Sequence, residues 1–322
     1  MIKYILKRIL IAIPLLLAMS LLTFVLMQMT PGNFFDSLKL DPQVSSETIE
    51  RYQELYSLDK PMLVQYFIWV KNIFKLEFGY SFFYNVPVSR ILKTRLINTF
   101  ILSLSSMLLT WMFAIPLGIW AAVRRGKLVD KVLSFMSFAG LSIPSFFLAI
   151  LLLYAASRIG VLPLGGMHSA HYQEFSAIGK FVDLLKHLAI PTVVISLGSI
   201  CALQRIMRGN FLETLRQQYI LTARAKGLPE NVVYYRHALR NAINPLITLF
   251  GYELSSLLGG AALIEIICNW PGLGSLMLTA VRSKDIYLVM SSMLMGGTLL
   301  LLGNLISDCL LAASDPRIRY EK

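Results

Sequence analysis

The sequence predicts an all-α polytopic membrane protein with six transmembrane helices and both termini on the cytoplasmic side. Of the 322 residues, 56% are hydrophobic and only 15% are charged, whereas an ordinary soluble domain carries about 25% charged residues. The apolar residues form long continuous runs, and the positive charges gather in a few of the segments between those runs. This composition excludes a disordered chain, a basic nucleic-acid-binding protein and most soluble enzymes.

Six apolar runs are candidates for crossing the hydrocarbon core as helices, which takes about 20 residues. They are Ile9–Met29, Asn98–Val123, Val132–Ser157, Leu188–Leu203, Leu246–Cys268 and Ile286–Ala312. The fourth run is the shortest and contains Pro191 and Gly198, which a bundled membrane helix tolerates. A transmembrane barrel would show short segments of alternating polarity, so the continuous runs favour helices.

The first run follows the basic residues Lys3 and Lys7. This beginning is similar to a secretory signal, but no small-residue cleavage site follows it, because Met27-Gln28-Met29 stands at that point. We therefore expect residues 1–29 to form an N-terminal tail and an uncleaved first span.

Positive charges orient the predicted spans. With a cytoplasmic N-terminus, the cytoplasmic segments hold 17 Lys and Arg residues, and the short outer segments 158–187 and 269–285 hold 5. Because Lys and Arg concentrate in the cytoplasmic loops of membrane proteins, both termini are expected on that side. Counted with their acidic residues, the cytoplasmic segments alone account for the formal charge of +12. These segments are 1–8, 124–131, 205–245 and 313–322.

Between the first two spans lies an extracytoplasmic segment, 30–97, that is too long for a turn and too apolar for a tether. A helix is expected to begin near Pro61, and Tyr66 and Trp69 suggest that it lies at the membrane interface. Two compatible interpretations are a packed extracytoplasmic cap and part of a docking surface for a delivery protein. The predicted organisation is completed by a five-helix core, 98–312, and a cytoplasmic tail, 313–322.

The cytoplasmic segment 205–245 is the most informative part of the chain. It carries seven basic residues, and the small residues Ala223 and Ala225 near its centre allow another surface to approach the backbone closely. Gly227 suits the end of a helix and Pro229 the start of the next one, so we expect a helix, a break and a second helix. Long ordered loops are usually functional, and both a partner surface and binding of anionic lipid fit these residues.

Motifs for catalysis and for nucleotide or metal binding are absent from the sequence. No Gly-x-x-x-x-Gly-Lys-Ser/Thr loop occurs, because the two Gly-Lys pairs are followed by Leu128 and Phe181. His-Glu-x-x-His and Gly-x-Ser-x-Gly are missing as well. His168 and His171 alone make an incomplete metal site, and the three cysteines have no paired spacing. We predict no catalytic residue, no metal site and no cofactor on this chain.

Four stretches, spread from residue 78 almost to the end of the chain, carry a family resemblance. They are Phe78-Gly79-Tyr80-Ser81, the cytoplasmic Thr222-Ala223-Arg224-Ala225-Lys226-Gly227 with the following Arg236-His237-Ala238-Leu239-Arg240-Asn241-Ala242, Trp270-Pro271-Gly272-Leu273-Gly274, and Asp315-Pro316-Arg317-Ile318-Arg319. With them the chain resembles the permeases of binding-protein-dependent ATP-binding-cassette (ABC) importers. The resemblance is specific to the first permease subunit, the B type, of dipeptide, oligopeptide and nickel systems. The family's Glu-Ala-Ala pattern before the glycine is Leu221-Thr222-Ala223 here, so the Glu is absent.

The resemblance implies a type I ABC importer permease fold in the cytoplasmic (inner) membrane of a bacterium, and import of dipeptides or oligopeptides. The chain is then expected to form half of the translocation pathway together with a second homologous permease subunit. An extracytoplasmic solute-binding protein would deliver the peptide, and two separate ABC ATPase subunits would bind ATP and Mg. Membrane lipid surrounds such a subunit, and nucleic acid has no part in its function.

The resemblance also implies roles for particular residues. Coupling to the ATPase subunits falls to Leu221, Thr222, Ala223, Arg224, Ala225, Lys226, Gly227, Arg236 and His237. A rigid outer turn near the gate is formed by Trp270, Pro271, Gly272, Leu273 and Gly274.

Three acidic residues fall within predicted spans, where a bare charge is expensive and marks a functional candidate. Glu253 lies deepest in the fifth span and Glu265 near its outer end, and both are candidates for lining the transport pathway. Glu253 suits the ammonium group of a peptide, and it equally suits a polar group on a neighbouring helix. Glu265 and Asp308 lie near span ends, where contact with interfacial water explains them as well.

Other functions remain open at this point. Within the same class, a permease for nickel or a metal–chelator complex has the same motifs. An ion-coupled carrier acting alone is a different class, but such carriers often contain internal repeats, and none is evident here. A membrane-embedded enzyme would need a nucleophile–base pair or metal ligands within the spans, and the sequence offers no such set.

Overall fold

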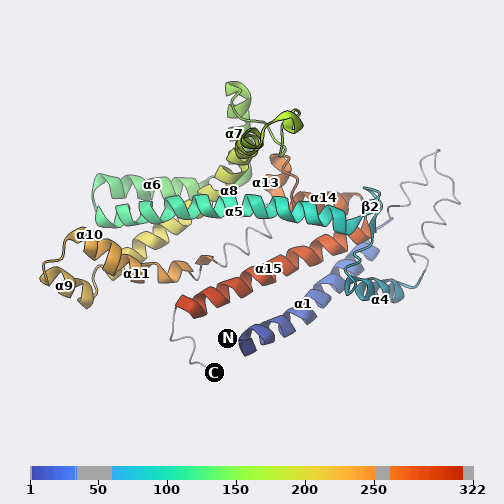
Figure 1. The fold of residues 1–322 in the computed structure, drawn as a ribbon, viewed down its shortest axis with the longest axis horizontal. Coiled ribbons are helices and arrows are strands. Elements are labelled where there is room, and N and C mark those ends of the chain that lie inside the picture. The colour runs from blue at the N-terminus through green and yellow to red at the C-terminus, as the bar shows by residue number, and fades with distance from the viewer. Residues whose placement is uncertain (1, 33, 35–59, 248, 251–261, 315–322) are drawn as a thin grey trace. The chain divides into compact units, whose positions relative to one another are not determined.

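A computed structural model describes residues 2–32, 34, 60–247, 249–250 and 262–314. Most of these residues are helical, and the only strands among them form one two-stranded antiparallel ladder (Figure 1). The chain divides into two compact units. Apart from Met1, unit 1 comprises Phe100–Trp270 and Leu300–Lys322, and unit 2 comprises Ile2–Thr99 and Pro271–Leu299.

Unit 2 is built from apolar helices and the small ladder. Its elements are α1 (Ile2–Met29), α4 (Met62–Ile73), β1 (Tyr80–Ser81), β2 (Val86–Pro87), the start of α5 (Val88–Val123), α14 (Leu273–Arg282) and the first part of α15 (Ile286–Ser314), whose remainder belongs to unit 1. In the ladder, Tyr80 lies opposite Pro87 and Ser81 opposite Val86. A largely all-α fold is therefore confirmed, with the ladder as its one addition in the described part of the chain.

The helix expected after Pro61 is present as α4, with Pro61 at its N-cap. Its two aromatic residues, Tyr66 and Trp69, are buried in a cluster with Phe24 of α1 and Met290 of α15. The Tyr66 hydroxyl lies 2.9 Å from the hydroxyl of Ser20. These rings therefore hold α4 inside its unit, which is consistent with a packed cap. The compatible interpretation of a docking surface stays a prediction.

Unit 1 contains the rest of α5 and the segment that the sequence analysis singled out. Its further elements are α6 (Leu128–Ser142), α7 (Ser145–Ile159), η1 (Tyr172–Glu174), α8 (Ala177–Thr214), α9 (Gln218–Ala225), α10 (Glu230–Val232), η2 (Val233–Ala238), α11 (Leu239–Ala242) and α13 (Ala262–Ile267). Helices α5 and α8 touch closely at Gly118, where an added Cβ would lie 2.7 Å from the Cβ of Met207. Residues of both helices enter the main apolar core of the unit.

Four described helices are long and apolar enough to cross a membrane, and a bent pair makes a possible fifth span. The four are Ile5–Met29, Val88–Val123, Ala177–Thr214 and Ile286–Cys309. These match the first, second, fourth and sixth predicted runs. The fifth run, Leu246–Cys268, lies mostly outside the described residues, and its end forms α13.

The third predicted span, Val132–Ser157, is not one continuous helix. It is divided between α6 and α7, whose axes differ by 98°. The break falls at Ile143, which has an extended backbone, and at Pro144, the N-cap of α7. Proline disfavours a helical conformation in the residue before it and lacks the N–H that a continuing helix would use.

Helix α8 is much longer than the predicted fourth span, Leu188–Leu203. Its 38 residues include Pro191 without interruption. The helix begins within the segment predicted as an outer loop and ends within the segment 205–245 predicted as cytoplasmic. The short apolar run is therefore only the middle of this helix, since both ends are too polar to be recognised from hydropathy.

Candidate functional site

The central feature of the candidate site is α9, the short helix within the segment 205–245. Ile220 and Ala223 of α9 are buried, and they are three residues apart, so they share one helix face. Both belong to an apolar cluster of unit 1, which we call the coupling core. Its buried members are Ala114, Ile119, Ala122, Leu203, Met207, Phe211, Ile220, Ala223, Val233, Ala238, Ala242 and Leu246.

The other face of α9 is exposed. Leu221 is 54% exposed, and Thr222 and Ala225 are exposed as well. The Thr222 hydroxyl donates to the carbonyl oxygen of Gln218 at 3.0 Å, so it is already used within the helix. The face offers an apolar side chain, a methyl group and little bulk, which suits close contact with another protein surface.

The helix ends in a tight turn, as the sequence predicted. Gly227 has a φ of +74°, a left-handed conformation that favours glycine over residues with a Cβ. Its N–H donates to the carbonyl of Arg224 at 2.9 Å. An added Cβ would meet nothing within 4 Å, so the requirement for glycine here comes from the backbone angle alone. Lys226, the C-cap residue, is exposed.

A bidentate ion pair closes this turn. The Nε and Nη2 atoms of Arg224 donate to the two carboxylate oxygens of Glu230 at 2.9 and 3.1 Å. The Arg224 side chain lowers the pKa of Glu230, and hydrogen bonding with Tyr234 acts in the same direction. A second tie joins the start of the segment to its end, because the Asn241 side-chain amide donates to the Tyr219 hydroxyl at 2.8 Å.

The chain after α10 takes the π-helical form over Val233–Ala238. This form is rare and is frequently found at functional sites. Val233 and Ala238 are buried in the coupling core, whereas Arg236 is exposed and His237 is half-buried. The residues predicted for coupling thus fall into two groups: Ala223 is an inward anchor, and most of the others lie on the outside.

Several residues of this segment were not singled out from the sequence. Ile220 is the larger of the two buried residues of α9. Its spacing of three residues from Ala223 is the sequence feature that predicts a shared buried face. Glu230 and Asn241 hold the segment closed through partners 6 and 22 residues away. The Tyr219–Asn241 pair is too far apart along the chain for any local pattern to show it.

The predicted outer turn is divided between the units after Trp270. In unit 1, Trp270 is buried with Leu102 and Leu188, and its backbone N–H donates to the carbonyl of Glu265 at 2.7 Å. Glu265 itself is buried in α13. Glu253, the other pathway candidate, lies outside the described residues.

In unit 2, the remaining residues of the turn are held by α5. The Asn98 side-chain amide donates to the carbonyl of Pro271 at 2.8 Å, and the backbone N–H of Leu273 donates to the Thr99 hydroxyl at 2.7 Å. Gly272 is the N-cap of α14, and Leu273 is buried. Gly274 follows in the first turn of that helix. These bonds support the prediction of a rigid local turn.

The Phe78-Gly79-Tyr80-Ser81 motif forms the start of the β-ladder in unit 2. Gly79 has a φ of +91°, and an added Cβ would lie 2.9 Å from the ring of Tyr287. The carboxylate of Asp285 accepts hydrogen bonds from the Ser81 hydroxyl at 2.7 Å and the Phe83 N–H at 3.1 Å. Burial raises the pKa of Asp285. This carboxylate ties the hairpin to the start of α15.

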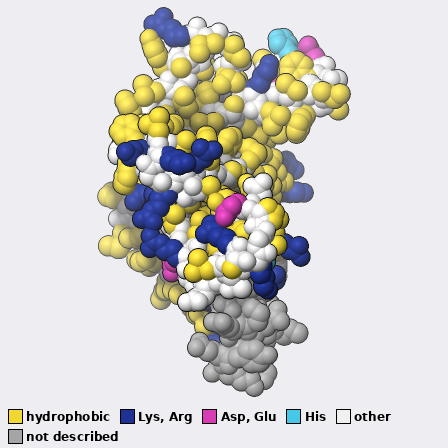
Figure 2. All heavy atoms as spheres, turned by 90° about the vertical axis from the view of Figure 1, so that its left-hand side faces the viewer, with side chains coloured by type: hydrophobic (Ala, Val, Ile, Leu, Met, Phe, Trp, Pro, Cys, Tyr) yellow, Lys and Arg dark blue, Asp and Glu magenta, His cyan; other side chains and the backbone are white. Residues whose placement is uncertain are grey.

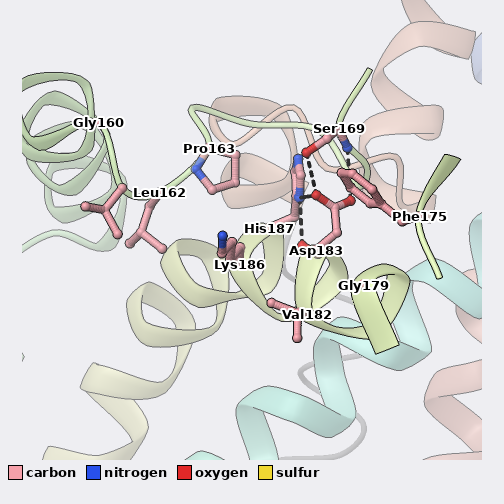
Figure 3. A pocket seen from close by; sticks show the side chains of 11 residues that line it. Gly160, Leu162, Pro163, Ser169, Phe175, Gly179, Val182, Asp183, Lys186 and His187 are labelled. Carbon is pink, nitrogen blue, oxygen red and sulfur yellow. Dashed lines mark hydrogen bonds and ion pairs between the residues drawn. The ribbon is translucent and has the colours of Figure 1, made fainter. Parts of the chain in front are cut away.

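A second carboxylate ties a loop of unit 1 to α8. Asp183 accepts a hydrogen bond from the backbone N–H of Ser169 at 3.0 Å and another from its hydroxyl. The His187 Nδ1 lies 2.8 Å from the carbonyl oxygen of Asp183. These groups line a cavity of about 540 Å³ (Figure 3). The His187 Nδ1 also lies 3.6 Å from this carboxylate, so Asp183 contacts both the serine and the histidine.

The two loop histidines do not converge on a metal. His168 stacks on Tyr172, with ring centroids 3.9 Å apart, and burial lowers its pKa. His171 pairs instead with Glu174 at 3.4 Å. In the described part of the chain, no three His, Cys, Asp or Glu side chains are grouped to hold a metal ion.

Comparison with known proteins covers the whole chain. Residues 114–320 match the family described as binding-protein-dependent transport system inner membrane component, and residues 1–105 match the corresponding N-terminal family. The oligopeptide transport system permease protein AppB of Bacillus subtilis is 39% identical over 99% of this chain and 100% of its own length. The di/tripeptide transport system permease protein DppB of Pseudomonas aeruginosa is 34% identical over 100% of both chains. The dipeptide transport system permease protein DppB of Lactococcus lactis is 35% identical over 99% of this chain and 100% of its own.

Proposed function

Because the chain belongs to the family of binding-protein-dependent transport system inner membrane components, we propose that it is the permease subunit of an ATP-driven importer of peptides. The observation that carries this proposal is the match, along the whole length, to permeases named for oligopeptides and for di- and tripeptides. Such a subunit has no ATPase site of its own. ATP and Mg are bound by two partner ATPase subunits.

The topology that fits this function has six spans and both termini in the cytoplasm of a bacterium. The four long apolar helices and the bent α6–α7 pair supply five of these spans, and the run Leu246–Cys268 supplies the sixth. The charge distribution supports the orientation, since Lys and Arg concentrate in segments that this topology leaves in the cytoplasm. The segment 30–97 then lies outside the cytoplasm and the tail 313–322 inside.

In the proposed cycle, a solute-binding protein delivers a peptide to the outer side, and ATP binding closes the two ATPase subunits. The exposed face of α9 contacts one ATPase subunit. Its buried face carries the movement into the coupling core, because Ile220 and Ala223 share that core with residues of α5 and α8. Leu221 replaces the Glu of the family pattern, so we expect this contact to be mainly apolar.

The outer turn Trp270–Gly274 has a different role in this proposal, as a rigid element near the outer gate. The buried Trp270 and the bonds from Asn98 and Thr99 support local rigidity. Glu253 and Glu265 are the proposed contributions to the pathway, which this chain forms together with a second, homologous permease. The burial of Glu265 is consistent with a position covered by protein and away from lipid.

Peptide is preferred over nickel or a metal–chelator complex because the relatives compared above are named for peptides. The test is uptake of labelled di-, tri- and longer peptides, and of nickel, by cells with and without this gene. Peptide uptake that depends on the gene is expected. Nickel uptake that depends on the gene, with unchanged peptide uptake, would overturn the peptide assignment.

Substitution on the exposed face of α9 tests the coupling role. Ala225→Trp adds bulk to that face and leaves the buried anchors in place, so gene-dependent peptide uptake is expected to fall while the subunit still inserts. Leu128→Trp, at an exposed position on the same side of the membrane in this topology, is the matched control. If the Ala225→Trp importer takes up peptide at the wild-type rate, the assignment of this face to the ATPase contact is refuted.

A further inference from the structure

A groove between α6 and α8 combines a positive charge with an apolar floor. Its volume is about 510 Å³, and it is lined by Ser134, Phe138, Leu141, Ala202, Arg205, Ile206 and Arg208. The lining is sorted by polarity along the groove. Ser134 and Arg208 lie toward one end, and Leu141 and Ala202 toward the other, because α6 and α8 run in opposite directions: Asp130 of α6 bonds to Arg208 of α8, and Ser137 bonds to Gln204. Ser134 and Leu141, which are seven positions apart in the sequence, lie about 10 Å apart along the axis of α6.

Arg205 provides the positive charge of the groove. Its guanidinium carbon lies 4.2 Å from the ring centroid of Phe138, which holds the planar group against the aromatic face. Stacking of this kind leaves the N–H groups at the edge of the guanidinium available for hydrogen bonds. Among the described residues no carboxylate is paired with Arg205, and its side chain is exposed.

Arg208, one turn further along α8, is engaged by a carboxylate. Its Nε and Nη2 atoms donate to Asp130 at 2.6 and 2.9 Å, and Asp130 also accepts from the Gly126 N–H at 2.9 Å. This pair neutralises Arg208 and joins the beginning of α6 to α8. The pair therefore shapes the polar end of the groove. Arg205 is then the groove's cation that no carboxylate of the described residues neutralises.

The apolar part of the groove opens onto a surface suited to hydrocarbon. Phe138 is 55% exposed, and Leu141 and Ile206 are 43% and 38% exposed. Phe135 and Met136 next to them on α6 are exposed as well. Figure 2, a view from the left-hand side of Figure 1, shows Lys and Arg side chains among hydrophobic ones on that face. Beyond Arg205 and Phe138 the groove continues to Leu141 and Ala202. A cation followed by an apolar track matches the layout of a lipid with a negative headgroup.

We propose that this groove binds an anionic phospholipid of the cytoplasmic leaflet. The phosphate of the headgroup accepts hydrogen bonds from Arg205, and an acyl chain follows Phe138, Leu141 and Ala202. The proposal rests on the proposed topology, which places this end of α6 and α8 on the cytoplasmic side, where anionic lipids attract basic residues. The proposed site is one defined groove between two helices, which distinguishes it from the general attraction of a basic loop to the membrane.

The groove also lies next to the machinery proposed for coupling. Met207, between the two groove arginines in the sequence, belongs to the coupling core, and Arg205 precedes the end of α8 at Thr214 by nine residues, or about 14 Å. A bound lipid would therefore brace α6 against α8 at the level where α8 meets the core. Loss of the lipid is expected to weaken the contact between α6 and α8, while all residues proposed for transport stay in place.

The test is native mass spectrometry of the purified importer, stripped of lipid and titrated with phosphatidylglycerol or phosphatidylcholine. We expect the wild type to retain phosphatidylglycerol more strongly, and Arg205→Gln to bind it about fivefold more weakly, the effect of one basic residue at an anionic surface. Arg158→Gln is the matched control, because Arg158 is also exposed and also stacks on an aromatic ring, that of Tyr154. The control should bind phosphatidylglycerol like the wild type.

Phe138→Leu is the second variant. It keeps the positive charge of Arg205 and removes the aromatic ring on which Arg205 stacks. If Arg205→Gln fails to assemble, this variant replaces it in the test. It should also weaken phosphatidylglycerol binding. Equal binding by wild type and by either assembled groove variant would overturn the proposal. Displacement of the lipid by a large excess of inorganic phosphate would overturn it too, because the site would then be one for soluble anions. Peptide uptake is measured separately. If the wild type takes up peptide but shows no preference for phosphatidylglycerol, the lipid site is refuted and the proposed function stands. If it takes up no peptide, the proposed function is refuted.

Discussion

Replacing Ile220 by alanine tests whether α9 is held in place by its buried side chains. Ile220 is fully buried in the coupling core, and truncating a buried isoleucine to alanine costs about 2–5 kcal/mol. Helix α9 has only 8 residues, too few for a stable isolated helix in water. Undocking of α9 and loss of its helix are therefore one event. A cost of about 2–5 kcal/mol raises the population of the open state about 30- to 5000-fold.

Hydrogen exchange measures this opening directly. Backbone amides of residues 218–225 in the purified importer should exchange faster in Ile220→Ala by roughly that factor, because their exchange follows local opening. Leu221→Ala, one residue further along, is the control, since a side chain that is 54% exposed should change the local stability by less than about 0.5 kcal/mol. If exchange in Ile220→Ala matches that of the control, the anchoring role of Ile220 is refuted.

Three further predictions follow from particular contacts. Gly118→Ala should lower the unfolding temperature, at a cost of about 1–3 kcal/mol, because the new methyl group would lie 2.7 Å from Met207 Cβ and 2.9 Å from a backbone oxygen. Asp285→Ala should speed hydrogen exchange across the hairpin 80–87, because it removes the acceptor of the Ser81 and Phe83 hydrogen bonds; unchanged exchange would contradict the tie. Glu230 has a folded pKa lowered by Arg224 from a usual value of 4.5, so the pair stabilises the turn above that pH and loses its effect as the pH falls through the lowered pKa. Because both side chains are partly exposed, the effect should stay below about 1 kcal/mol; unfolding temperatures measured against pH should show it in the wild type and not in Glu230→Gln.

Hydropathy predicted most of the long helices because burial in hydrocarbon demands continuous apolar runs, but it did not predict where a run breaks. Pro14, Pro116 and Pro191 lie inside α1, α5 and α8, and none of them ends its helix. Pro144 separates α6 from α7 by a bend of 98°. The same residue type gives both outcomes because the missing hydrogen bond can be tolerated within a packed helix. The choice depends on tertiary contacts that a linear pattern does not contain.

The candidate site shows the same limit at the level of single residues. The small size of Ala223 predicts that another surface approaches it closely, and the structure shows that this surface is the chain's own core. Ala225, two residues along, remains exposed. Tyr66 and Trp69 likewise have the composition of interface anchors but are buried in their unit. The sequence predicted that these two segments contain helices, whereas the inward or outward direction of each side chain was set by the packing of distant elements.

The two faces of α9 imply different consequences for substitutions. The buried face belongs to a core that includes Met207 of α8, and Gly118 lets α5 lie directly against that residue. Close-packed interiors respond to a push by moving as a body, since they have little room to compress. A displacement of α9 by a partner should therefore move the ends of α5 and α8 together with it. It follows that a change such as Ile220→Ala should uncouple the partner's movement from the spans with little effect on partner affinity. A change on the exposed face, such as Ala225→Trp, should weaken the affinity itself.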